Sequence, residues 1–220
     1  MKIAAILLAA GNGSRFYKSY LENNIEKIGY DQNEIENCNN KMLYKVQGKP
    51  MYQYALDCIK AQSQIDKIVL VTQYKEITDA EPNITIKNNN SDLGISHSIH
   101  LGIEAVKSDS LSPYHYLFVV CDQPFLRATT IEKFIKGYKE SKKGIGCLAI
   151  GKEMKNPVIF SPKYEKELLL LEGDRGGKKV VKKHLDDVYL YEVEDKEELE
   201  DFDTLEKLLR KVGENDRFSC

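Results

Sequence analysis

The five cysteines of the sequence are odd in number and include no C-x-x-C pair. A structural zinc site needs closely spaced ligand pairs and a disulfide framework needs an even set, so the pattern argues against both. Cys58, Cys121 and Cys147 lie in apolar runs and are expected to be core residues. The remaining two are Cys38 and Cys220. This usage indicates a reducing compartment, the cytoplasm.

The sequence also lacks the run of about 20 apolar residues that a membrane-spanning helix requires. Its first apolar run, 2–8, opens with a single lysine and leads into glycines, so we expect a core strand rather than a signal peptide. Lys and Arg number 32 against 34 Asp and Glu, a net charge of -2. Such a balance offers no basic field for nucleic acid, and any anion binding must be local. We therefore expect neither a nucleic-acid nor a membrane partner.

The opening run ends in the turn Ala9-Ala-Gly-Asn-Gly-Ser-Arg15. Its spacing fits neither the dinucleotide fingerprint nor the P-loop. Glycine lets the backbone approach a ligand, and successive N–H groups can then converge on an anion. Arg15 adds a planar cation suited to phosphate. The segment is either an ordinary tight turn or a loop that holds the phosphates of a nucleotide.

Strands alternate with helices along most of the remaining chain. Strands are expected at 67–72, 83–87, 116–121, 145–150, 156–160 and 188–193. Helices are expected at 51–59, 94–106, 129–139, 162–171, 178–184 and 205–212. This alternation predicts an α/β fold with a mostly parallel sheet between two helix layers, a three-layer α/β/α sandwich. The length of 220 residues is sufficient for one such domain.

Residues 17–40 interrupt the pattern, because they are rich in Asn, Glu, Lys and Tyr and show no sustained period. We expect a single domain at 1–213 with a flexible inserted loop at 17–40, and a frayed tail at 214–220. The insertion is either a solvated loop or a mobile cover over the glycine turn.

Asp122 follows the apolar run 116–121, so it should lie at the carboxyl end of a strand, where ligands of parallel sheets bind. A carboxylate beside an anionic ligand requires a cation between them, and Mg²⁺ binds carboxylates together with phosphate oxygens. The other interpretation is a turn aspartate. Asp203 is either a second ligand or a helix cap. Lys41 and Arg15 could neutralise charge on a pyrophosphate leaving group, although Lys41 could also be a surface lysine.

These segments resemble a known enzyme family. Leu8-Ala-Ala-Gly-Asn-Gly-Ser-Arg-Phe16, Asn40-Lys-Met-Leu43, Gly48-Lys-Pro50 and Cys121-Asp-Gln-Pro124 are similar to motifs of the molybdopterin guanylyl- and cytidylyltransferases. Asn156-Pro-Val-Ile-Phe160 and Leu171-Glu-Gly-Asp-Arg-Gly-Gly-Lys178 resemble the molybdenum cofactor cytidylyltransferase branch. Asp201-Phe-Asp-Thr204 matches the closing element of the family, so the resemblance covers nearly the whole chain.

The resemblance implies a Rossmann-like fold of the nucleotide-diphospho-sugar transferase type. It implies transfer of CMP from CTP, or of a nucleotide from another NTP, to the terminal phosphate of molybdopterin or the molybdenum cofactor. Mg²⁺ would be the cofactor and pyrophosphate the second product. A molybdenum hydroxylase is a possible client. Ala10, where guanylyl-transferring relatives tend to have glycine, favours a cytosine nucleotide.

The same resemblance assigns residues to roles. Arg15, Lys41 and Asp122 are the catalytic candidates, and Asp122 and Asp203 the metal ligands. The nucleotide-binding candidates are Ala9, Ala10, Gly11, Gly13, Ser14, Arg15, Lys41, Ser96 and Ser98. The acceptor-binding candidates are Asn156, Asp174, Gly176 and Gly177, of which the last three open a helix.

Several alternatives stay open. The family's lysine usually follows its arginine more closely, so Lys18 could replace Lys41 at the phosphates. Cytidylyl transfer to a polyol phosphate and nucleotidyl transfer to a sugar phosphate are rival activities, although their usual His-Asp…Arg-Pro and Gly-Thr-Arg segments are missing. A non-catalytic protein that binds the molybdenum cofactor is the third alternative, and the presence of Arg15, Lys41 and Asp122 argues against it. The four histidines are spaced too irregularly for a metal cluster.

Overall fold

The computed structural model describes residues 1–24, 40–108 and 113–212. Its centre is a seven-stranded sheet in the order β5-β4-β1-β6-β8-β7-β9. The strands are β1 (Lys2–Ala9), β4 (Lys67–Thr72), β5 (Thr85–Lys87), β6 (Tyr114–Val120), β7 (Ile145–Ile150), β8 (Glu153–Phe160) and β9 (Val188–Glu192). Only β8 runs antiparallel to its neighbours, β6 and β7, so the expected mostly parallel sheet is confirmed.

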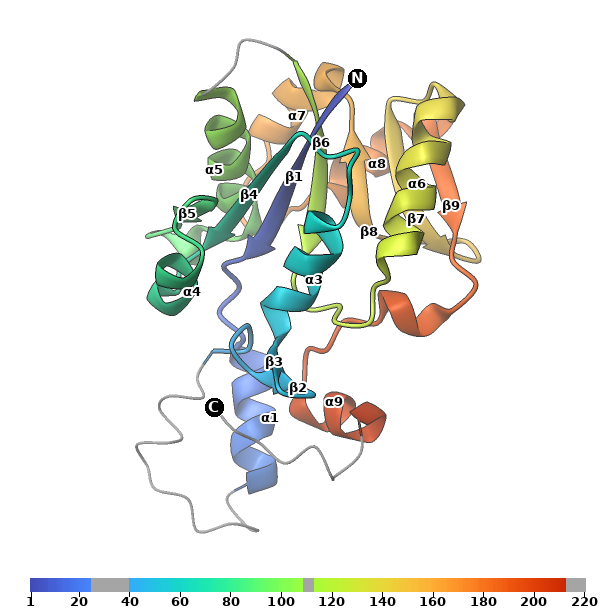
Figure 1. The fold of residues 1–220 in the computed structure, drawn as a ribbon. Helices are drawn as coiled ribbons and strands as arrows, with labels where there is room; N and C mark the ends of the chain where they lie inside the picture. Colours follow the sequence, from blue (N-terminus) through green and yellow to red (C-terminus); the bar gives the residue numbers. More distant parts are fainter. Residues whose placement is uncertain (25–39, 109–112, 213–220) are drawn as a thin grey trace.

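Helices cover both faces of this sheet (Figure 1). They are α3 (Met51–Lys60), α4 (Lys75–Ala80), α5 (Ile95–Ser108), α6 (Ala128–Ser141), α7 (Glu165–Leu169) and α8 (Lys178–Lys183). Side chains of α3 and α6 pack on one face and those of α5, α7 and α8 on the other. Neighbouring residues of β1 point to opposite faces, so that Ala5 and Leu7 join the first core while Ala4 and Ile6 join the second. The continuous apolar run of β1 is therefore buried on both sides, as a central parallel strand requires.

A third, smaller apolar cluster lies beyond the carboxyl end of β1. It joins α1 (Ser14–Asn24), the hairpin of β2 (Lys45–Val46) and β3 (Lys49–Pro50), and α9 (Leu205–Val212). Figure 1 shows these elements together below the sheet. The buried members of the cluster are Phe16, Tyr44, Val46, Met51, Phe202 and Leu208.

The expected start of the inserted loop is wrong, because residues 17–24 continue the helix α1. The sequence there has no sustained apolar period, so tertiary contacts determine this helix. The N–H of Tyr17 donates to the carbonyl oxygen of Gly13 at 2.9 Å, and the ring of Phe16 packs edge-on against Tyr44. Residues 25–39 of the expected insertion, and the expected tail, lie outside the described residues.

The structure differs from the sequence-based expectation at three further places. The helix expected at 162–171 is a 3-10 turn, Pro162–Tyr164, followed by the five-residue α7. Neither α4 nor the β2–β3 hairpin follows from the sequence pattern. That hairpin turns at Gln47 and Gly48, which both have positive φ, the geometry of a two-residue connection.

None of the helices in the three described ranges is both long enough and apolar enough to cross a lipid bilayer.

The three described cysteines lie in the core, as expected. Burial raises the pKa of the thiols of Cys58 and Cys147 to about 12, and it also raises the pKa of Cys121. At pH 8 a thiol of pKa about 12 is ionised in only about one molecule in 10⁴, and the thiolate is the reactive form. We expect iodoacetamide to leave these three thiols unmodified in the native protein and to label them fully in guanidinium, as peptide mass mapping would show. Native labelling at the rate of free cysteine would contradict the core assignment.

Candidate active site

The glycine turn, residues 10–13, leaves β1 at its carboxyl end and leads into α1. Three consecutive carbonyl oxygens, of Ala9, Ala10 and Gly11, accept hydrogen bonds from the side chains of Thr72, Gln73 and Tyr74 at 2.7 to 3.1 Å. The C=O and N–H of one trans peptide point in opposite directions. The N–H groups of these peptides therefore face away from the end of β4, as a turn that binds an anion requires.

Gln73 and Tyr74 support the glycine turn through these hydrogen bonds, and no sequence motif predicts that role. Gln73 also donates to Asn12 Oδ1 at 2.9 Å, and Ser91 Oγ donates to Gln73 Oε1 at 2.8 Å. The available signal was position, because both residues directly follow the strand 67–72 that neighbours β1.

Lys41 lies between the two carboxylates that the sequence nominated as metal ligands. Its Nζ donates to Asp122 Oδ2 at 2.8 Å and to Asp203 Oδ1 at 3.1 Å. Only 6% of the Lys41 side chain is exposed, so the interpretation as a surface lysine is wrong. Arg15 reaches the other oxygen of Asp203 at 3.1 Å. Two cations thus face two anions beside the glycine turn.

The helix-cap interpretation of Asp203 does not hold, because Thr204 Oγ1 accepts the hydrogen bond from the N–H of Lys207 in the first turn of α9. Burial raises the pKa of the Asp203 carboxyl, but the charge and hydrogen bond of Lys41, with the charge of Arg15, outweigh it and lower that pKa. Asp203 is therefore ionised at neutral pH.

Asp201 shows the opposite shift. Burial and the negative charge of Asp122 raise the pKa of its carboxyl, although Gln123 Nε2 donates to it at 2.8 Å. The N–H of Phe202 donates to the carbonyl oxygen of Asp122 at 3.0 Å. These contacts fix the segment 201–203 against the end of β6.

The donor set fits a divalent cation. Asp122 Oδ1 is buried and has no hydrogen-bond partner among the described residues. An unpaired buried carboxylate oxygen is costly unless a cation or water meets it. No group of three or more His, Cys, Asp or Glu in the described ranges could hold a metal. Two carboxylates with the remaining positions left to phosphate and water are the usual arrangement for Mg²⁺.

These groups open into one cavity of about 620 Å³. Most of the predicted site residues line it: Ala10, Gly11, Gly13, Ser14, Arg15, Lys41, Ser98, Asp122, Asp174 and Asp203. Lys18 is not part of this lining. A volume of this size suits a nucleotide-sized ligand.

A second glycine loop, residues 173–177, contacts the turn at Gly94, and Gly94 and Asp174 both line the cavity. Gly94 has φ +84° and ψ -178°, and a Cβ there would lie 2.4 Å from the backbone carbon of Gly173. The N–H of Ser96 donates to the carbonyl oxygen of Gly173 at 3.1 Å. The turn at Gly94 and the loop that carries Asp174 are thus in direct contact.

Ser98, which lines the cavity, accepts at its Oγ from Asn88 Nδ2 at 3.0 Å. The five other predicted site residues do not line the cavity, and of these Ala9 is fully buried. Ser96, Asn156, Gly176 and Gly177 lie outside the lining of the cavity. A Cβ on Gly177 would lie 3.0 Å from the Phe160 ring, so this glycine allows close packing onto β8.

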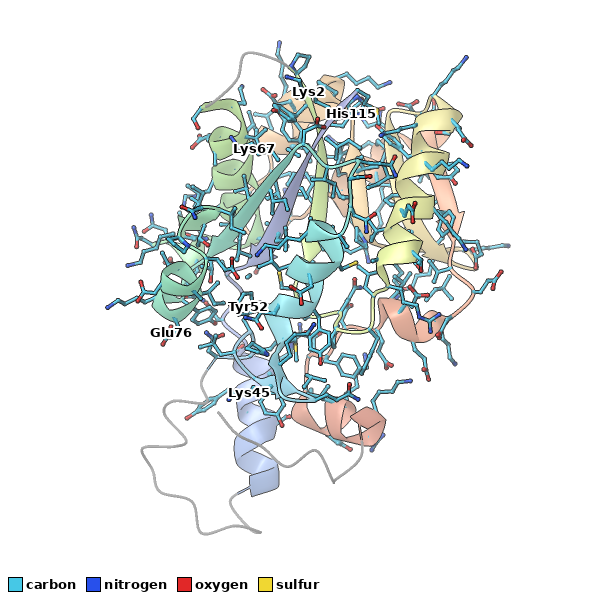
Figure 2. All side chains as sticks on the ribbon, in the orientation of Figure 1. Lys2, Lys45, Tyr52, Lys67, Glu76 and His115 are labelled. Atoms are coloured by element: carbon cyan, nitrogen blue, oxygen red, sulfur yellow. The ribbon has the colours of Figure 1, made fainter. Side chains whose placement is uncertain are left out.

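His115, one of the four histidines, lies far from this cavity. Figure 2 shows it beside Lys2 at the amino-terminal end of the sheet, and its Nδ1 pairs with Tyr138 Oη at 2.9 Å.

A glycine turn, paired carboxylates and cations at the carboxyl ends of parallel strands define a nucleotide-binding enzyme domain of the nucleotidyltransferase class. The chain belongs to the family of MobA-like NTP transferase domains, whose model matches residues 5–188. The family resemblance in the sequence is thereby confirmed.

The curated proteins to which the chain is similar include different kinds of enzyme. The chain is 35% identical over 89 residues, 40% of its length, to 2-C-methyl-D-erythritol 4-phosphate cytidylyltransferase of Clostridium tetani. It is 26% identical over 153 residues, 67% of its length, to the bifunctional protein GlmU of Caldicellulosiruptor saccharolyticus. Each match spans 28% of the length of that relative.

Solved structures share the fold. A nucleotidyl transferase from Methanothermobacter (Mth528) superposes with a TM-score of 0.74 at 19% identity over 96% of both chains. Rv0371c of Mycobacterium tuberculosis, solved with manganese, gives 0.62 at 16% identity over 88% of this chain and 89% of that one. Molybdopterin-guanine dinucleotide biosynthesis protein A of Archaeoglobus fulgidus gives 0.59 at 13% identity over 96% and 97%. The expected nucleotide-diphospho-sugar transferase type of fold is confirmed.

Proposed function

We propose that the protein transfers CMP from CTP to the terminal phosphate of molybdopterin or the molybdenum cofactor, with release of pyrophosphate. The observation that carries this proposal is the cluster of Lys41, Asp122 and Asp203 beside the glycine turn, in one cavity. Opposed charges at that position suit a triphosphate and its divalent cation.

In this reaction a phosphate oxygen of the acceptor attacks the α-phosphorus of CTP, and the bond to the β-phosphate bridging oxygen breaks. No covalent enzyme intermediate is needed. The turn from Ala9 to Arg15 holds the triphosphate through its N–H groups, and Lys41 and Arg15 neutralise charge on the pyrophosphate. Asp122 and Asp203 would hold Mg²⁺, which would supply further charge neutralisation when bound. Orientation of the two phosphates in line contributes most of the remaining rate.

The acceptor enters from the side of the second glycine loop. Asp174 lines the cavity there, and we assign it to the acceptor with Asn156, Gly176 and Gly177. Ser98 also lines the cavity, and we assign it to CTP together with Ser96. A cytoplasmic molybdenum hydroxylase that receives the product is part of the same proposal.

Two features support a cytosine nucleotide. Ala10 stands where guanylyl-transferring relatives tend to have glycine, and it lines the cavity. One curated relative is itself a cytidylyltransferase. That relative also favours a second candidate, cytidylyl transfer to a polyol phosphate.

The test is pyrophosphate release from each of the four NTPs with Mg²⁺, in the presence of molybdopterin, molybdenum cofactor or 2-C-methyl-D-erythritol 4-phosphate. We expect release from CTP with a molybdenum-pterin acceptor at least tenfold faster than from any other pair, since one discriminating hydrogen bond is worth about that factor. Omission of the metal should abolish it.

Other outcomes separate the alternatives. Release from GTP alone would overturn the cytosine assignment, and release only with the polyol phosphate would establish the second candidate. No release from any NTP, with tight binding of the molybdenum cofactor, would identify a non-catalytic binding protein.

A further inference from the structure

The ammonium group of Lys41 occupies the bridging position between the two carboxylates. Nζ lies 2.8 Å from Asp122 Oδ2 and 3.1 Å from Asp203 Oδ1, one oxygen from each residue. Lys41 therefore supplies the positive charge that a metal ion held by these two carboxylates would supply.

The charges explain why this arrangement is stable. The Lys41 side chain is 6% exposed, and a buried ammonium requires anionic partners. Asp122 and Asp203 in turn require a cation, because two like charges that share one site repel each other. Arg15 completes a neutral set of two cations and two anions.

A divalent cation and Lys41 cannot occupy the bridge together. Mg²⁺ binds carboxylate oxygens at about 2.0–2.1 Å, which would bring the two cations into close repulsive contact. Removing Lys41 from the carboxylates without a new partner would leave its charge buried and unpaired, which is also costly. The free metal alone must therefore bind weakly.

The phosphates of a nucleotide offer that new partner. A Cβ on Gly13 would lie 3.1 Å from the Cβ of Lys41, so the lysine side chain begins directly against the glycine turn. Its backbone is held by the turn 40–43, where Asn40 Oδ1 accepts from the N–H of Met42 at 2.9 Å. Rotation about side-chain bonds, with no backbone movement, would redirect the ammonium from the carboxylates to the phosphates.

We propose that Lys41 is an exchangeable counterion: it holds Asp122 and Asp203 in the nucleotide-free protein and gives them up to a divalent cation when the triphosphate arrives. This inference rests on the nucleotide and metal site of the proposed function. Its consequence is reciprocal coupling, because the nucleotide that draws Lys41 away increases metal affinity and the metal increases nucleotide affinity.

The experiment measures Mn²⁺ binding by electron paramagnetic resonance to the wild type and to Lys41→Met, without nucleotide. We expect Lys41→Met to bind Mn²⁺ about tenfold more tightly, a coupling of usual size. With a non-hydrolysable CTP analogue the order should reverse, because the variant lacks the cation that binds the phosphates. Lys49→Met is the matched control, since it removes one positive charge from an exposed pair with Asp57 and should leave Mn²⁺ affinity unchanged.

Equal or weaker Mn²⁺ binding by folded Lys41→Met would overturn the exchange. If that variant does not fold, a crystal structure of the wild type with MnCl₂ and the analogue decides. We expect Nζ to lie beyond the ion-pair distance of about 4 Å from both carboxylates, and its persistence on them would overturn the inference. Failure of pyrophosphate release would refute the proposed activity and leave this binding result standing, so the two failures are distinguishable.

Discussion

Asp122→Asn is expected to lower the rate of pyrophosphate release about 10³-fold at saturating substrates, which corresponds to about 4 kcal/mol of transition-state stabilisation. The physical reason is the loss of the charge at Asp122, the one carboxylate in the described ranges with a buried oxygen that has no hydrogen-bond partner. The amide keeps the shape of the side chain and can still accept from Lys41. The variant should therefore fold normally, with a melting temperature within a few degrees of the wild type.

Asp57→Asn is the matched control for this variant. It makes the same chemical change at an exposed carboxylate that pairs with Lys49 on the surface. Steady-state kinetics should show wild-type kcat for the control. A rate for Asp122→Asn within fivefold of the wild type would contradict the assignment of Asp122 as a metal ligand.

Gly94→Ala is expected to lower kcat/KM about 100-fold, mainly through weaker substrate binding. A φ of +84° with an extended ψ is accessible essentially to glycine only and costs other residues roughly 1–3 kcal/mol. The new Cβ would also meet the backbone of Gly173 at 2.4 Å, where no flexible side chain can yield. Either the turn at Gly94 or the loop at Gly173 must then move, and the part of the cavity lining formed by Gly94 and Asp174 moves with it.

Gly151→Ala is the control that distinguishes the cost of backbone strain from the effect of the contact between Gly94 and Gly173. Gly151 has φ +59° in the turn between β7 and β8, and no atom in the described ranges would lie within 4 Å of its new Cβ. Both variants should lose stability in urea melts, but only Gly94→Ala should lose substrate affinity. Similar losses of kcat/KM in both would show that contact between the two loops is irrelevant to binding.

The sequence predicted the parts of the fold that depend on local pattern. The apolar run 2–8 is continuous because both faces of β1 are buried, and a buried strand of this kind is recognisable without knowledge of its neighbours. Asp122 was found because it ends such a run. The helix at 14–24 escaped prediction because contacts with distant residues, such as Phe16 with Tyr44, determine it.

The candidate site was only partly predictable for a related reason. Lys41 and Asp203 are 162 positions apart, and no local rule indicates that their charged atoms meet. The family resemblance nominated both residues for separate roles. Their pairing, and the hydrogen bonds from Gln73 and Tyr74 to the glycine turn, are visible only in the three-dimensional structure.

The small apolar cluster beyond the sheet has a consequence for how the enzyme can change over evolution. Arg15, Lys41 and Asp203 belong to segments anchored in it by Phe16, Tyr44 and Phe202, whereas Asp122 extends from the sheet itself. Selection that maintains the chemistry of the site must therefore also act on these uncharged aromatic rings, because they position the charged residues. Substitutions among them should persist only in sets that preserve combined volume.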